Sequence, residues 1–113
     1  MAYGVIEALR AEGIEDMPVV SYDGNPQAVE LVTQGKILAT VFTNPYWAGG
    51  ITAALAYYAA TGAFKPSAEP HEHREFLGPT ILVTTKDARE FKARYIDTNP
   101  QYDWKNFWAL ASK

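Results

Sequence analysis

The chain has 113 residues, so it forms one domain or part of one, with room for a modest hydrophobic core. Ten basic and thirteen acidic residues give a formal net charge of −3, and no basic patch stands out, which argues against nucleic acid as a partner. The absence of cysteine excludes disulfides and thiolate metal sites, but it does not fix the cellular compartment.

The first residues of the chain are typical of a helix. Ala2, Ile6 and Leu9 fall on one helical face, and Gly13 stands where such a helix would end. A signal peptide is not expected here, because the start has neither a basic segment nor a long apolar run. Since no capping residue precedes this helix, we expect that a longer polypeptide preceded it.

Helices and strands alternate along the rest of the chain. Helices are predicted at 2–12, 26–35, 45–61, 86–96 and 103–111, and strands at 18–22, 37–42 and 80–84. This alternation predicts an α/β fold, a Rossmann-like lobe with a parallel sheet of three strands. The unbroken apolar run Ile81-Leu82-Val83 favours strands that are covered on both faces.

Polar residues follow two of these strands. Open α/β sheets bind ligands beyond the carboxyl ends of their strands, which is where Asp23 and Asn44 are expected. An ionised carboxylate at Asp23 can accept hydrogen bonds from neighbouring hydroxyls of a sugar. The alternative for Asp23, followed by Gly24, is a turn residue that bonds its own backbone. The alternative for Asn44 is an N-cap of the helix that begins at Pro45.

Two aromatic residues begin the helix after Asn44. Tyr46 and Trp47 are candidates for a ligand site or an interface, because aromatic rings pack on the apolar faces of sugar rings and keep a polar group free. The alternative is that they fill a core. At the other end of the chain, Trp104, Phe107 and Trp108 share one helical face, which we expect to dock on the body of the protein.

No motif in the chain indicates an enzyme. The nucleophile elbow, the phosphate-binding loops and the zinc-protease helix motif are all missing from the sequence. His71 and His73 lie in a segment rich in proline and glutamate, 62–79, which we interpret as a solvated loop rather than a metal site. We therefore expect no metal and no cofactor.

Several motifs together resemble the C-terminal part of periplasmic sugar-binding proteins of the ribose-, galactose- and xylose-binding type, which feed ABC importers. The resemblance extends over nearly the whole chain and rests on Met1-Ala2-Tyr3-Gly4, Val19-Val20-Ser21-Tyr22-Asp23-Gly24, Gly35-Lys36-Ile37-Leu38-Ala39-Thr40-Val41, Asn44-Pro45 and Ile81-Leu82-Val83-Thr84. It implies that Asp23 binds sugar hydroxyls. It also implies that Asn44 reaches the ligand at a position where the family commonly has glutamine.

Proteins of this type have two lobes with a cleft between them, so the resemblance implies a truncated chain. Residues 1–43 would belong to the C-terminal lobe. Residues 44–79 would cross to the other lobe, and their helix would pack on that missing N-terminal lobe. Residues 80–113 would supply the return strand, a helix and the tail.

The implied function of the parent protein is to bind a monosaccharide or polyol in the periplasm and deliver it to the membrane subunits of an importer. Hinge closure around the ligand would be the mechanism, without a cofactor. The alternative is a fragment of the effector-binding domain of a sugar-responsive transcriptional repressor, which shares the same core and carries a separate DNA-binding headpiece.

We expect the isolated chain to lack sugar affinity, since one lobe cannot enclose a ligand. In helix 45–61, the apolar face of Ile51, Leu55 and Tyr58 would have no partner within the chain. The chain is therefore predicted not to be a simple monomer. Its partner would be the missing lobe or, by element swapping, a second copy.

Overall fold

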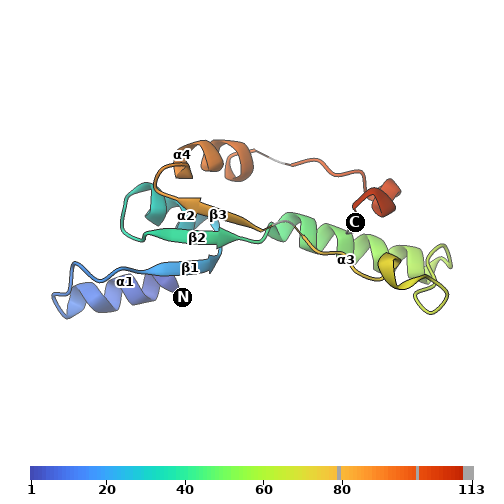
Figure 1. The fold of residues 1–113 in the computed structure, drawn as a ribbon, viewed down its shortest axis with the longest axis horizontal. Coiled ribbons are helices and arrows are strands. Elements are labelled where there is room, and N and C mark those ends of the chain that lie inside the picture. Colours follow the sequence, from blue (N-terminus) through green and yellow to red (C-terminus); the bar gives the residue numbers. More distant parts are fainter. Residues whose placement is uncertain (79, 99, 111–113) are drawn as a thin grey trace. The chain divides into compact units, whose positions relative to one another are not determined.

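The computed structural model describes residues 1–78, 80–98 and 100–110. Figure 1 shows the helices and strands of this part of the chain in sequence order. The helices are α1 (Ala2–Ala11), α2 (Pro26–Thr33), α3 (Pro45–Ala60) and α4 (Ala88–Phe91), and the strands are β1 (Val20–Asp23), β2 (Ala39–Phe42) and β3 (Ile81–Thr84). A π-helical turn, Lys92–Ile96, continues α4, and 3₁₀ turns occupy His71–His73 and Trp104–Leu110.

The chain divides into two compact units. Unit 1 comprises Met1–Thr43 and Thr80–Asn99, and unit 2 comprises Asn44–Pro79 and Pro100–Lys113. The sheet and the helices α1, α2 and α4 belong to unit 1, whereas α3 and the last 3₁₀ turn belong to unit 2.

The sheet of unit 1 has the strand order β1-β2-β3. The predicted α/β fold is confirmed, and β1 and β2 are parallel, with Asp23 opposite Phe42. The expectation that all three strands are parallel is wrong, because β3 runs antiparallel to β2 and pairs Ile81 with Phe42. The chain leaves unit 1 after β2 and re-enters at the same end of the sheet, so the returning strand must run backward.

Helices α2 and α4 cover one face of the sheet. Val29, Phe42 and Val83 are buried there, and the Phe42 ring meets the ring of Phe91 edge to face, with centroids 5.0 Å apart. The buried Thr40 on this face has a hydrogen-bond partner, since the hydroxyl of Ser21 donates to that of Thr40 over 2.7 Å.

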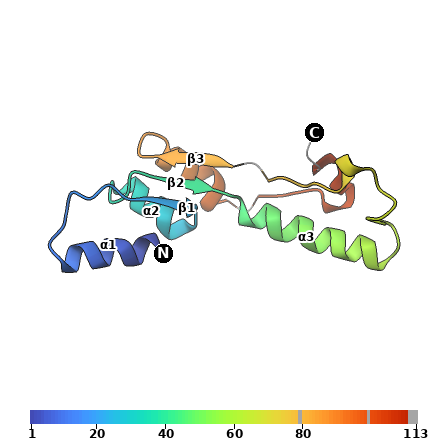
Figure 2. The same ribbon diagram turned by 60° about the horizontal axis from the view of Figure 1, so that its bottom comes forward.

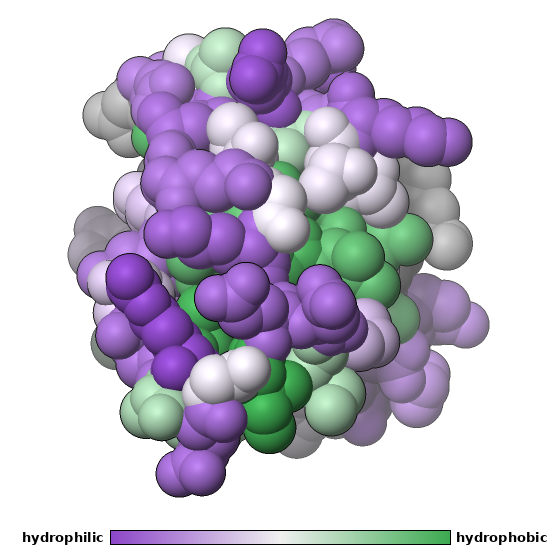
Figure 3. All heavy atoms as spheres, turned by 90° about the vertical axis from the view of Figure 1, so that its left-hand side faces the viewer, coloured by the Kyte–Doolittle hydropathy of each residue, from purple (hydrophilic) through white to green (hydrophobic). Residues whose placement is uncertain are grey.

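The other face of the sheet carries exposed apolar side chains. Val20, Tyr22 and Leu82 are 67%, 64% and 59% exposed. The prediction that Ile81-Leu82-Val83 is covered on both faces is therefore wrong for Leu82, because the described helices of unit 1 pack on the side of Val83. Apolar residues also lie exposed among polar ones on the face of the molecule drawn in Figure 3, coloured green among purple.

Local hydrogen bonds fix the ends of the helices in unit 1. Asn25 accepts a bond from the amide of Ala28 over 2.9 Å and Pro26 takes the first helical position, as the sequence predicts.

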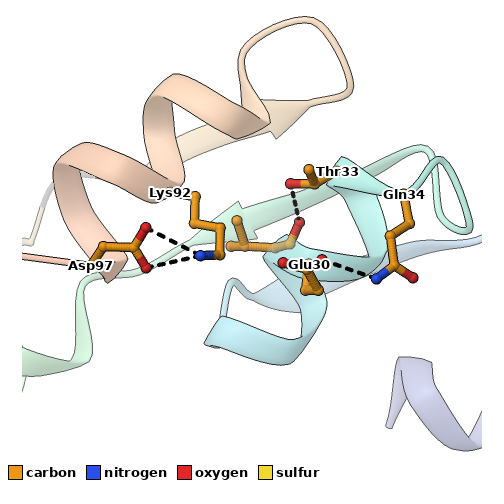
Figure 4. Close-up of polar contacts among 6 residues, drawn as sticks. Glu30, Thr33, Gln34, Lys92 and Asp97 are labelled. Atoms are coloured by element: carbon orange, nitrogen blue, oxygen red, sulfur yellow. Dashed lines mark hydrogen bonds and ion pairs between the residues drawn. The ribbon is translucent and has the colours of Figure 1, made fainter.

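The helix predicted at 86–96 is shorter in the structure, because α4 ends at Phe91 and the chain continues as the π-helical turn. The ammonium group of Lys92 donates hydrogen bonds to both carboxylate oxygens of Asp97, at 2.9 and 3.1 Å (Figure 4). These hydrogen bonds and the charge of Asp97 raise the pKa of Lys92.

Helix α3 carries no charged residue, and one of its faces forms the core of unit 2. Trp47, Ile51 and Phe64 are buried together. Leu55, Tyr58, Phe76, Tyr102 and Trp104 pack around them. The expectation that Ile51, Leu55 and Tyr58 have no partner within the chain is therefore wrong. No helix in the described residues is long and apolar enough to cross a membrane.

The last 3₁₀ turn docks on α3 through Trp104, whose ring lies where a Cβ atom at Gly50 would stand. This confirms the predicted docking for Trp104, whereas the side chains of Phe107 and Trp108 lie outside the described part of the chain. Gly50 thus permits a close approach of helix and indole, and the neighbouring Gly49 faces open space.

The two glycines of α3 are expected to respond to alanine in opposite ways. Gly49→Ala should stabilise unit 2 by about 0.5–1 kcal/mol, because alanine restricts the unfolded chain and favours the helix. Gly50→Ala should destabilise it by about 1–3 kcal/mol, because the new methyl group displaces Trp104. Urea unfolding followed by tryptophan fluorescence measures both, and parallel shifts of the two midpoints would contradict the packing of Trp104 on Gly50.

Candidate functional site

Asp23 ends β1 with an exposed side chain and an unusual backbone. Its φ of 88° lies in the left-handed region, which aspartate and asparagine tolerate better than most residues. Within the described residues, no hydrogen bond or ion pair engages its carboxylate. Backbone strain of this kind collects at functional sites, so Asp23 is the strongest candidate of the sequence analysis.

The chain after Asp23 explains why that conformation is held. Gly24 also has a positive φ, 61°, and a Cβ atom there would stand 2.6 Å from the Cα atom of Phe42. The turn therefore crosses directly over the end of β2 before Asn25 caps α2. A strand on one side and a capped helix on the other fix the position of the carboxylate.

A groove of about 480 Å³ runs beside Asp23 within unit 1. Tyr3, Tyr22, Asn25 and Gln27 line it together with Asp23. Both tyrosines are more than half exposed, so their rings are available to a ligand. A carboxylate, two carboxamides and two aromatic rings are the groups that recognise a polyhydroxylated ring, through directional hydrogen bonds and through packing on its C–H face.

The side chain of Asn44 is engaged within unit 2. Its Oδ1 accepts a hydrogen bond from the amide of Trp47 over 3.2 Å, which confirms the predicted N-cap of α3. Its Nδ2 donates to the hydroxyl of Tyr102 over 2.6 Å, and the residue is only 5% exposed. Its φ of 51° is the second positive value of a residue other than glycine in the described chain. Sequence reasoning missed Tyr102, because nothing local links residues so far apart.

The two aromatic candidates of α3 differ in their surroundings. The ring of Trp47 is buried, 6% exposed, and packs against Gly78, where a Cβ atom would stand 2.9 Å from the indole. Tyr46 is 53% exposed on the first turn of the helix. Asp23 therefore lies in unit 1, and the other three candidates, Asn44, Tyr46 and Trp47, lie in unit 2.

The histidines of the proline-rich segment form local pairs. His71 lies 3.5 Å from Glu75, and both side chains are exposed, whereas His73 lies 3.2 Å from the partly buried Glu69. Among the described residues, no three histidine, aspartate or glutamate side chains are grouped so that they could hold a metal ion.

Comparison with known proteins identifies the family. The family described as periplasmic binding protein domain matches residues 1–63, which is more than half of the chain. The chain belongs to the periplasmic binding protein family. Proteins of this family bind solutes and are not enzymes, in agreement with the lack of catalytic motifs in the sequence.

The solved structures that this chain resembles belong to longer proteins of known structure. A twin-arginine translocation pathway signal protein from Burkholderia phytofirmans is 31% identical, with a TM-score of 0.81, over 99% of this chain and 34% of its own. A solute-binding protein of an ABC transporter from Bacillus halodurans C-125, with bound myo-inositol, is 33% identical over 83% of this chain and 30% of its own, with a TM-score of 0.65.

A third structure shares the fold at lower identity. It is a periplasmic solute-binding protein of an ABC transporter from Actinobacillus succinogenes 130z with bound D-allose, 24% identical over 79% of this chain and 29% of its own, with a TM-score of 0.63. No curated protein sequence matches the chain. The chain thus spans about a third of the length of the structures it resembles.

Proposed function

We propose that the chain is the C-terminal part of a periplasmic protein that binds a monosaccharide or polyol for an ABC-type importer. The observation that carries the proposal is Asp23, an exposed carboxylate that has no partner among the described residues and is held in a strained conformation at the end of β1. The relative from Bacillus halodurans, in which myo-inositol is bound, supports a polyhydroxylated ring as the class of ligand.

Each candidate residue has a proposed role. Asp23 accepts hydrogen bonds from neighbouring sugar hydroxyls, as in the ribose-, galactose- and xylose-binding type that the sequence resembles. Asn44 presents the remaining hydrogen of its Nδ2 while Tyr102 holds the other, so Tyr102 positions the carboxamide. Tyr46 offers an exposed ring to the sugar, and the buried ring of Trp47 anchors the first turn of α3 in the core of unit 2.

The division of the chain fits the same proposal. Unit 1 would correspond to the C-terminal lobe of a two-lobed binding protein, and α3 in unit 2 would belong with the N-terminal lobe. These ligand groups are then only part of a site, because this chain covers only 34% and 30% of the two relatives that share more than 30% of its sequence. Importer subunits would contact the complete protein.

The isolated chain is expected to bind sugar negligibly. Part of a site supplies only some of the hydrogen bonds and leaves the ligand open to water, which competes for the same groups. Isothermal titration calorimetry with a panel of pentoses, hexoses and myo-inositol should give no measurable heat of binding. Micromolar affinity for any of them would show that the chain is a complete binding protein, contrary to the proposal.

A further inference from the structure

Asp23 and Gly24 are the only aspartate–glycine pair in the sequence. In such a pair the main-chain nitrogen of the glycine can approach the side-chain carboxyl group closely, because glycine has no Cβ atom in the way. Asparagine reacts in the same manner as aspartate, but all four asparagines of the chain precede proline or phenylalanine. Proline has no N–H that could take part. The sequence therefore concentrates this chemistry at one position.

The turn after β1 leaves both reacting groups unengaged. The side chain of Asp23 is exposed, and its carboxylate has no partner among the described residues. In the same part of the chain, the amide of Gly24 donates no hydrogen bond. Figure 2 shows β1 beside β2, with the chain turning from the end of β1 into α2. An attack of this amide on this carboxyl group therefore breaks no hydrogen bond of the described fold.

The other aspartates differ from Asp23 in one of these two respects. Three of them accept hydrogen bonds through their carboxylates: Asp87, Asp97 and Asp103. The fourth, Asp16, is exposed and has no partner among the described residues, but the larger Met17 follows it. Asp16 is therefore an internal control, which matches Asp23 in exposure and lacks the glycine.

We propose that Asp23 is a site of spontaneous modification, at which its link to Gly24 isomerises in the folded chain. The amide nitrogen of Gly24 attacks the Cγ atom of the side-chain carboxylic acid. An N–C bond forms, the nitrogen gives up its proton and the carboxyl group its hydroxyl, and one water leaves as a five-membered succinimide ring closes. Water then opens the ring at one of its two carbonyl groups.

The position of ring opening decides the product. Opening at Cγ restores aspartate. Opening at the main-chain carbonyl of Asp23 gives isoaspartate, in which the main chain runs through Cγ and the free carboxylate is attached to Cα. The water that left is regained in both cases, so the isomerisation changes neither the mass nor the oxidation state of the chain.

The conformation of the turn gives this reaction a direction and a consequence. Asp23 has a φ of 88°, a strained value for a residue with a side chain, and the longer isoaspartyl link relieves that strain. The same lengthening displaces Gly24, where a Cβ atom would stand 2.6 Å from the Cα atom of Phe42. Isomerised molecules should therefore unfold at lower urea concentrations than unmodified ones.

Ageing of the native chain tests the proposal. The chain is kept at physiological temperature in mildly acidic buffer, with a sample unfolded in urea as the reference. A protease that cuts before aspartate should lose its cleavage at Asp23 and keep it at Asp16, because it does not recognise isoaspartate. Isoaspartyl methyltransferase should label the peptide that contains residue 23, and mass spectrometry should detect a transient species lighter by one water.

Asp23→Glu is the matched variant. It keeps a carboxylate in the turn, but its ring would have six members and closes far more slowly, so the methyl label should disappear. The comparison of Asp23 with Asp16 in the native chain needs no substitution and holds even if this variant folds poorly.

Three results would overturn the proposal. The first is a native chain without isoaspartate at Asp23, most clearly if the sample in urea contains it. The second is equal modification of Asp16 and Asp23, and the third is a label that survives Asp23→Glu. None of these readouts involves a sugar, so they are independent of the function proposed above.

Discussion

Gly24→Ala is expected to destabilise unit 1 by about 2–5 kcal/mol, a large share of the stability of a domain of this size. Two costs add. Alanine at a φ of 61° meets the steric penalty of the left-handed region. In addition, its methyl group would stand 2.6 Å from the Cα atom of Phe42, and this backbone atom moves only if β2 moves with it. Circular dichroism during urea unfolding measures the loss.

Gly35→Ala is the matched control for this prediction. Gly35 has a φ of 70°, close to that of Gly24, but a Cβ atom there would meet nothing within 4 Å. Gly35→Ala should therefore lower the free energy of unfolding only by the conformational penalty, about 1 kcal/mol. The difference between the two variants isolates the close approach of the Asp23-Gly24 turn to β2. Equal losses of stability would show that the turn does not cross β2 as described.

Local chemistry made much of the fold predictable from the sequence. Asn25-Pro26 and Asn44-Pro45 each combine a capping carboxamide with a proline at the first helical position, so both helix starts are encoded within a few residues. The parallel pair β1 and β2 likewise follows from the short helical crossover between them.

Long-range arrangement was not predictable in the same way. The direction of β3 depends on where the chain re-enters unit 1 after α3, and no residue near Ile81 encodes this. The apolar face of α3 finds its partners in Phe64, Phe76 and the tail residue Trp104. Helical periodicity identifies such a face, but it does not identify what covers it.

The candidate site shows the same limit. A turn aspartate after a strand was recognisable, but its positive φ and the lack of a partner for its carboxylate among the described residues appear only in the structure. The second hydrogen bond of Asn44, to Tyr102, joins residues separated by 58 positions. Tyr22 was visible as one aromatic among several, and its 64% exposure appears only in the structure.

Asp23→Asn is expected to weaken sugar binding by roughly 10- to 100-fold in a complete binding protein that contains this chain, because a hydrogen bond to a charged acceptor contributes about 1.5–3 kcal/mol. Asparagine tolerates the positive φ of this position, so the substitution removes the charge and spares the turn. The effect of the charge is thereby separated from that of the fold.

The decisive measurement is a calorimetric titration of a chimaera in which this chain replaces the matching third of the Burkholderia phytofirmans protein, which it resembles over 99% of its length. With pentoses, hexoses and myo-inositol as probes, the chimaera should bind at least one of them. Asp23→Asn should weaken that binding as stated, and Asp16→Asn, at an exposed acidic residue of the same unit, should not. Sugar binding that is unchanged by Asp23→Asn would contradict the assignment of Asp23 as the carbohydrate contact.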